Sequence, residues 1–262
     1  MVVRALDDVH NKVVRNAAHL IRSAQARERA GQTVLEGPHL IWEALSAKAR
    51  LRAVLYSNRL MYRPDGQELY RRMTGGSTRT VYVTDRVLDH VTMVDNHQGV
   101  VAIAEMGVAT RPRLETGPVL LCDGVQDPGN LGALMRAAAA FGFELALAAG
   151  TVDPMNPKVL RASAGAFFHL PVYHLAPGWE WDPALTLVVT DPAEGVPYRE
   201  WSWPRGMALA IGNEGAGVSV DVRERAQVGL AIPMQPGVES LNVAVAAGIL
   251  MAEAHARWRL HR

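Results

Sequence analysis

Arg136 is the only charged side chain in an alanine-rich segment that follows the apolar run PVLLCDGV and a turn at residues 127–129. Apolar run, turn and alanine-rich segment together predict a strand, a tight turn and a helix. Asn130 is expected to cap this helix, and Arg136 follows within two turns. Burying an unpaired guanidinium costs several kcal/mol, so Arg136 needs a partner, and phosphate is one candidate.

Two later stretches repeat this order of strand, loop and polar residue. In ALAIGNEGAGVS, an apolar run enters a glycine-rich loop with Glu214 at its centre. In LAIPMQPGVESLNVAVAAG, a strand leads through a proline-rich loop to Ser240, Leu241 and Asn242, which precede a helix of small residues.

The segments NLGALMRAAAAFG, IGNEGAG and IPMQPGVESLNVAVAAGI closely resemble, in the same order, the three signature motifs of the SpoU (TrmH) family of RNA 2′-O-ribose methyltransferases, part of the SPOUT superfamily. The resemblance implies methyl transfer from S-adenosyl-L-methionine to a ribose 2′-hydroxyl, with ribosomal RNA as the leading substrate. A tRNA enzyme of the same family and a non-catalytic RNA-binding protein are the alternatives. The resemblance further implies a homodimer formed through the C-terminal domain, with the second chain helping to bind RNA.

The resemblance also assigns catalytic roles. Arg136 would engage an RNA phosphate and help to activate the hydroxyl; whether it is itself the general base stays open, since arginine is protonated at ordinary pH. Asn130 would order Arg136 and the substrate, unless it only caps the helix. Glu214 would fix Arg136 through an ion pair, the alternative being an exposed loop carboxylate. Ser240 and Asn242 would orient substrate and loop, although Ser240 could be only a cap.

A cofactor site is implied at Thr190, Ile211, Gly212, Ile232, Met234, Leu241 and Asn242. Ile232 and Leu241 would sandwich the adenine, and Gly212 would permit a close backbone approach. A Rossmann nucleotide site is disfavoured because neither glycine cluster has the G-x-G-x-x-G spacing. The nine histidines show no clustered ligand spacing, so no metal is expected.

The elements around these motifs predict an α/β protein with two domains. Alternating strands and helices between residues 33 and 104 predict a small domain. Its segments VLEGPHLIWEAL and HQGVVAIAE resemble the ends of the family's L30e-like RNA-binding domain. Residues 1–106 are therefore assigned to that domain, 107–117 to a linker, and 118–262 to a parallel-sheet methyltransferase domain. The resemblance implies that this last domain is tied in a deep trefoil knot.

Charge is distributed unevenly. Residues 1–113 carry 17 Lys and Arg against 11 Asp and Glu, a balance of +6, whereas the remainder carries 10 against 15, a balance of −5. The basic part is the candidate RNA surface. A single helix is expected from residue 7 to residue 30, where Arg15, Arg22 and Arg27 would contact RNA or form an ordinary solvated face.

The remaining sequence features bear on location and redox chemistry. No apolar run approaches the roughly 18 residues of a membrane helix, and the N-terminus lacks a hydrophobic signal segment, so a cytoplasmic protein without membrane contact is expected. Cys122 is the only cysteine, and it is expected to be a buried strand thiol and not a nucleophile.

Overall fold

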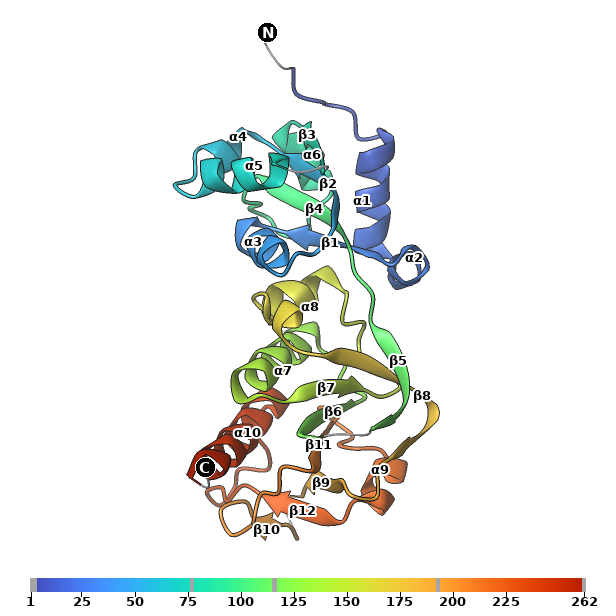
Figure 1. Ribbon diagram of the computed structural model, residues 1–262, viewed down its shortest axis with the longest axis vertical. Helices are drawn as coiled ribbons and strands as arrows, with labels where there is room; N and C mark the ends of the chain where they lie inside the picture. Colours follow the sequence, from blue (N-terminus) through green and yellow to red (C-terminus); the bar gives the residue numbers. More distant parts are fainter. Residues whose placement is uncertain (1–3, 76–77, 115–116, 192–193, 261–262) are drawn as a thin grey trace. The chain divides into compact units, whose positions relative to one another are not determined.

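The computed structural model describes residues 4–75, 78–114, 117–191 and 194–260. The chain forms two compact units (Figure 1). The first unit consists of two segments, the chain as far as Gly107 and residues Asp153–Phe168. The second unit consists of Val108–Val152 and the chain from His169 onward. No helix of the described residues is long and apolar enough to cross a membrane.

The first unit contains a four-stranded mixed sheet. Its strands are β1 (Gln32–Glu36), β2 (Leu51–Tyr56), β3 (Arg79–Tyr82) and β4 (Val100–Glu105), in the order β1-β4-β2-β3. Strand β4 runs antiparallel to β1 and β2, whereas β2 and β3 are parallel. The four strands lie where the alternating pattern of the sequence predicts them.

Helices cover both faces of this sheet (Figure 1). They are α1 (Lys12–Arg22), α2 (Ala24–Ala30), α3 (Pro38–Ser46), α4 (Asn58–Met61), α5 (Gly66–Thr74), α6 (Asp85–His90) and α8 (Pro157–Ala162). The expected single helix from 7 to 30 is in fact two helices. Ser23 has an extended backbone that ends α1, and its hydroxyl accepts a hydrogen bond from the Ala26 amide and so caps α2.

The second unit contains an eight-stranded sheet in which every pairing is parallel. The strands are β5 (Ala109–Leu114), β6 (Val119–Asp123), β7 (Glu144–Leu147), β8 (Val172–Trp181), β9 (Thr186–Thr190), β10 (Val196–Pro197), β11 (Met207–Gly212) and β12 (Val228–Ala231), in the order β10-β12-β9-β11-β6-β7-β8-β5. Because parallel strands end at one edge, the loops that follow β6, β9, β11 and β12 meet there.

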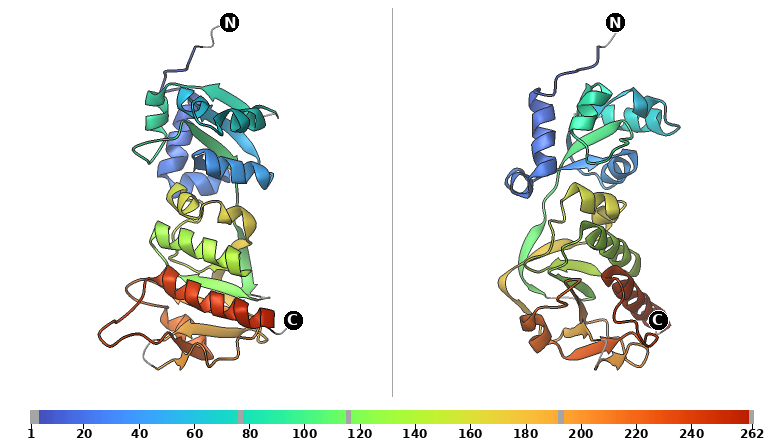
Figure 2. Two further views of the ribbon diagram at one scale, coloured as in Figure 1. Left: turned by 90° about the vertical axis from the view of Figure 1, so that its left-hand side faces the viewer. Right: turned by 180° about the vertical axis from the view of Figure 1, so that it is seen from behind.

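Three helices complete this unit: α7 (Pro128–Phe141), α9 (Val220–Arg225) and α10 (Val243–Leu260). Helices α7 and α10 lie side by side (Figure 2). Buried strand residues such as Leu121, Ala146 and Leu187 form the core with Val222 of α9. Cys122 is fully buried, and burial raises the pKa of its thiol, as expected for a strand cysteine without nucleophilic character.

Two segments differ from the expected division of the chain. Residues Ala109–Leu114, inside the expected linker 107–117, form edge strand β5, because backbone hydrogen bonds to β8 need no apolar side chains. Residues Asp153–Phe168, inside the expected domain 118–262, pack with the first unit. There the Thr33 hydroxyl donates to the Met155 carbonyl at 2.6 Å.

Candidate active site

Asp127 caps the N-terminus of α7. Its Oδ1 accepts a hydrogen bond from the Asn130 amide at 2.7 Å, and its backbone is extended. Pro128 follows at the first helical position, where a missing N–H costs nothing. The expectation that Asn130 caps this helix was therefore wrong. Asn130 lies in the first turn instead, which leaves its side-chain amide available for contacts with other loops.

Asn130 joins the three polar loops. Its Nδ2 donates to Glu214 Oε1 at 2.9 Å, and its Oδ1 accepts from Nδ2 of Asn242 at 2.9 Å. Asn242 also accepts backbone hydrogen bonds from Ala244 and Val245 and thereby caps α10. One amide side chain thus connects the ends of α7 and α10 with the loop after β11.

Glu214 is held as a carboxylate. Partial burial opposes its ionisation, but hydrogen bonds from the Asn130 side chain and from backbone amides including that of Asp127 outweigh it, so the pKa of Glu214 is lowered. An ionised acceptor makes these hydrogen bonds stronger than a neutral one would.

Arg136 lies on the exposed surface of α7, as the ninth residue of the helix. Among the residues that the structure describes, no ion pair joins it to Glu214. The expectation of a Glu214–Arg136 ion pair was therefore wrong, and so was that of a buried guanidinium in need of a partner. Arg136 keeps all its donors available for an external anion.

The loop after β11 is organised by Asn213, which sequence reasoning missed. Its Oδ1 accepts from the amides of Gly215 and Ala216, and its Nδ2 donates to the Gly124 carbonyl at 3.1 Å. Asn213 and Gly217 also exchange backbone hydrogen bonds of 2.8 and 2.9 Å. An asparagine at the start of a glycine-rich loop was the available signal, because its side chain can bond to nearby backbone amides.

Only glycine fits at position 212, because backbone atoms of the following loop lie too close for a side chain. A Cβ built there would lie 2.0 Å from the carbonyl carbon of Gly217 and 2.1 Å from the Val218 amide nitrogen. The backbone that approaches Gly212 closely is thus that of residues 217 and 218, which follow it in the same loop. Ile211 is only 1% exposed, so it can offer a ligand its backbone groups but not its side chain.

One pocket of the second unit gathers most of the expected cofactor residues. Thr190, Ile232, Met234 and Leu241 line it, and Ile211, Gly212 and Asn242 do not. Ser240, expected to orient the substrate, also lines the pocket, as do Leu230 and Ala246, which sequence reasoning missed. No described residue of the lining is charged, and Leu241 is 36% exposed. A neutral, apolar wall of this kind fits an adenine ring.

The described residues contain no group of His, Cys, Asp and Glu side chains arranged to hold a metal ion. Asn130, Glu214 and Asn242 supply the polar groups where the three loops meet, Ser240 lines the pocket, and Arg136 is exposed on α7. An amide network, a fixed carboxylate and an exposed guanidinium can order loops and bind an anion.

Comparisons with known proteins agree with this geometry. Residues 117–252 match the model of the SpoU rRNA Methylase family, and residues 11–102 match that of the MRM3-like substrate binding domain. The chain is 31% identical to the 23S rRNA (guanosine(2553)-2′-O)-methyltransferase RlmP of Bacillus subtilis, over 95% of this chain and 98% of that protein. It is 34% identical to an uncharacterised tRNA/rRNA methyltransferase of Synechocystis, over 96% of this chain and 93% of that protein.

A solved structure extends the likeness to three dimensions. The SpoU methyltransferase AviRb of Streptomyces viridochromogenes, in complex with AdoMet, superposes with a TM-score of 0.83 at 27% identity, over 96% of this chain and 99% of that one. The family model covers more than half of the chain, and the loops that carry the family's motifs meet at one edge of the parallel sheet. This protein therefore belongs to the SpoU rRNA methylase family.

Proposed function

We propose that this protein transfers a methyl group from S-adenosyl-L-methionine to a ribose 2′-hydroxyl of ribosomal RNA. The observation that carries this function is the hydrogen-bonded connection of Glu214, Asn130 and Asn242, which brings the three motif loops together beside an apolar pocket. A non-catalytic RNA-binding protein would not need to retain this network.

The cofactor supplies a methyl group on a positively charged sulfur. Ile232 and Leu241 bind the adenine between them, while Thr190, Met234 and Ser240 line the rest of the pocket. Ile211, Gly212 and Asn242 contribute backbone groups at its margin. An apolar pocket of this kind excludes water and holds the donor in one orientation.

The protein's own polar residues act on the RNA. Arg136 binds a phosphate next to the target ribose and so positions the 2′-hydroxyl. As the hydroxyl oxygen takes the methyl group, the S–C bond of the sulfonium would break and the hydroxyl proton would pass to solvent. Glu214 and Asn242 hold Asn130, which fixes the first turn of α7 relative to the other two loops. Arg136 is a positioning and electrostatic group in this proposal, because a guanidinium does not release its proton at neutral pH.

Further features are proposed on the strength of family membership. The second unit is threaded as a trefoil knot, a proposal supported by the insertion of β11 between β6 and β9. The first unit has an L30e-like fold and binds the substrate, as the match over residues 11–102 suggests. We also propose that the chain divides into a substrate-binding domain (1–106), a linker (107–117) and a methyltransferase domain (118–262). The ranges matched by the two family models support this division.

Assembly and location complete the proposal. The protein forms a homodimer through the second unit. Exposed apolar side chains support this proposal: Val238 lies just before α10, and Val245 lies in its first turn. It acts in the cytoplasm, where ribosomal RNA would be available to it.

Transfer of a labelled methyl group tests the function. Unmodified ribosomal RNA and, separately, tRNA transcripts are incubated with the protein and labelled S-adenosyl-L-methionine, and each RNA is then digested to nucleosides. Label in a 2′-O-methylated nucleoside from ribosomal RNA supports the proposal, and label from tRNA alone supports the tRNA alternative. Label in neither pool, with cofactor binding intact, contradicts an enzyme acting on free RNA.

A further inference from the structure

A basic groove lies on the first unit, far along the chain from the residues of the proposed active site. It is a cavity of about 1150 Å³ between α1 and the strands. Its cationic lining residues are Lys12, Arg15, Arg22, Arg52 and Arg79, and three histidines, His10, His19 and His90, join them. No Asp or Glu occurs among the described residues that line it.

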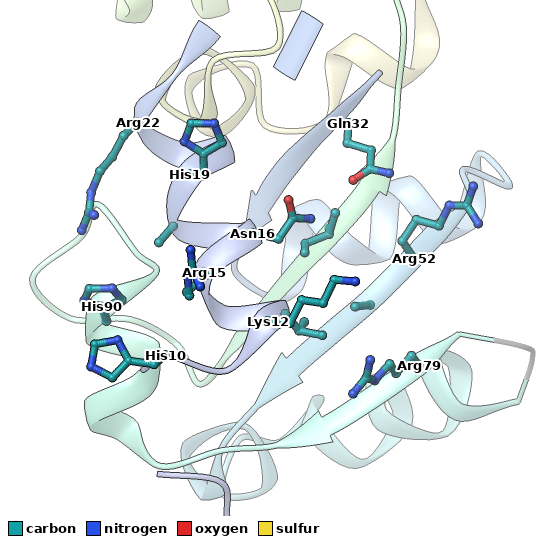
Figure 3. A pocket seen from close by; sticks show the side chains of 14 residues that line it. His10, Lys12, Arg15, Asn16, His19, Arg22, Gln32, Arg52, Arg79 and His90 are labelled. Carbon is teal, nitrogen blue, oxygen red and sulfur yellow. The ribbon is translucent and has the colours of Figure 1, made fainter. Parts of the chain in front are cut away.

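Figure 3 shows how these side chains are arranged. Arg52 and Arg79 come from the neighbouring strands β2 and β3, whereas His10 and His90 lie on the other side of α1. The apolar side chains of Ala53 and Ile103 are also part of the lining. The groove therefore has an apolar part of the sheet between cationic margins.

Helix α1 presents its basic residues in a row. Lys12, Arg15, His19 and Arg22 follow one another at intervals of three or four residues, which places them on one face. Val14, Ala17 and Ile21 are buried in the core beneath. From Lys12 to Arg22 the row extends about 15 Å, the length of roughly four nucleotides of a stacked duplex strand.

Four of the five Lys and Arg residues of the groove differ from other arginines of the same unit, because they have no carboxylate partner among the described residues. Arg63 pairs with Asp65, Arg71 with Glu68 and Arg86 with Asp7. Lys12, Arg15, Arg22 and Arg79 have no such carboxylate among the described residues, and only Arg52 of the groove is paired, with Glu105. Four free cations around one concave surface create a positive field that suits a polyanion.

We infer that this groove binds the ribose-phosphate backbone of the RNA substrate and contributes affinity without reading sequence. The inference rests on the proposed function, since it assigns part of the substrate contact to a named surface. No Phe, Tyr or Trp occurs among the described lining residues, so the groove lacks the larger aromatic platforms for base stacking. Phosphate contacts from Arg and Lys supply affinity that falls steeply with salt.

A triple variant of the full chain tests the groove. Arg15→Gln, Arg22→Gln and Arg79→Gln together remove three free cations. The control variant, Arg29→Gln, Arg63→Gln and Arg71→Gln, removes the same charge at other sites of the unit. Binding to a ribosomal RNA transcript and to an unrelated RNA duplex is measured between 50 and 300 mM salt, chosen to span roughly the range in which phosphate contacts weaken.

The groove variant is expected to lose at least about tenfold in affinity at low salt, for both RNAs alike. Its slope of log affinity against log salt should be shallower by about 2 to 3 than that of the wild type. Replacement of the same three residues by Lys should restore most of the slope, because the charge returns. The control variant should keep a slope close to the wild-type value.

Equal losses in the two variants would overturn the inference, since net charge alone would then explain them. A slope of log affinity against log salt that is unchanged in the groove variant would also overturn the inference. The groove would then bind an acidic partner other than RNA. These binding measurements do not depend on methyl transfer. Absence of methyl transfer by the wild type would therefore contradict the proposed function, but the binding measurements would still test whether the groove binds RNA.

Discussion

Arg27 and Asp153 form a buried ion pair in which Nη2 of Arg27 lies 2.6 Å from Oδ2 of Asp153. The Arg27 Nε donates to the same oxygen at 2.7 Å, and Nη1 donates to the carbonyl of Leu20 at 2.7 Å. The Arg27 side chain is only 4% exposed. The expectation that Arg27 would contact RNA alongside Arg15 and Arg22 was therefore wrong. Arg27 stabilises the first unit by fixing the end of α1 to the segment that begins at Asp153.

Replacement of Arg27 by Ala should lower the free energy of unfolding by about 2 to 4 kcal/mol, because Asp153 and the Leu20 carbonyl lose their donor. Urea denaturation followed by circular dichroism measures this change. Arg29→Ala, on the exposed surface of the same helix, is the matched control and should change stability by no more than about 0.5 kcal/mol. Equal effects of the two substitutions would show that the ion pair contributes nothing specific.

Glu36 should make the first unit less stable as the pH rises. Its carboxylate accepts from the Met93 amide at 3.1 Å and from Arg161 Nη1 at 2.9 Å, yet burial outweighs both contacts and raises its pKa above the ordinary 4.5. The folded state therefore binds this proton more tightly than the unfolded state does. The resulting stabilisation is complete below pH 4.5 and is lost as the pH rises through the raised pKa.

Glu36→Gln removes this titration. The difference in unfolding free energy between wild type and variant should shift in favour of the variant as the pH rises from 4 to about 7, the range in which a raised carboxyl pKa acts. Urea titrations at several pH values measure it, with the exposed Glu28→Gln as the control for loss of a carboxylate. A difference that stays constant over this range would contradict the raised pKa.

Local patterns were sufficient to predict most elements, whereas only the family resemblance implied that residues of the three loops act together. Alternation of apolar residues marks the strands, and parallel strands place the segments that hold Asn130, Glu214 and Asn242 at one edge. Thr190, Ile232, Met234 and Leu241, which the family resemblance pointed to, line one pocket, and their role in binding the cofactor stays a prediction.

The errors concern contacts between residues far apart in the chain. Nothing near Arg27 in sequence indicates that Asp153 will bury it, and nothing near residue 109 indicates that β8 will accept an edge strand. The choice between Asp127 and Asn130 as cap was local, and the proline at position 128 favoured Asp127. The exposure of Arg136 also had a local signal, because Leu131, Leu134, Met135 and Ala138 have the spacing of one buried helix face and Arg136 lies off it.

Gly212→Ala should displace the loop that carries Glu214. Its new methyl group would overlap backbone atoms of Gly217 and Val218, which cannot move aside as a flexible side chain could. Methyl transfer should fall at least about tenfold, because Glu214 would no longer be held in its hydrogen bond to Asn130. Gly215→Ala is the matched control, since a Cβ there meets only Asn213 Oδ1, at 3.6 Å. Loss of activity in both variants alike would contradict this explanation.

Arg136→Ala should reduce methyl transfer on the order of 100-fold, the cost typical of removing one preorganised charged donor from a transition state. Folding and cofactor binding should be close to wild type, because the guanidinium is exposed and does not line the pocket. Steady-state transfer of labelled methyl groups and calorimetric titration with S-adenosyl-L-methionine measure the two effects separately.

The exposed Arg259→Ala on α10 is the control for loss of one surface charge in the same unit. Arg136→Lys should recover part of the activity if phosphate binding is the role, since a lysine keeps the charge but not the fork of donors. If Arg136→Ala instead retained wild-type turnover, the RNA phosphate would have to be bound by another residue. If it lost cofactor affinity with transfer otherwise unchanged, Arg136 would belong to the cofactor pocket and not to the RNA contact.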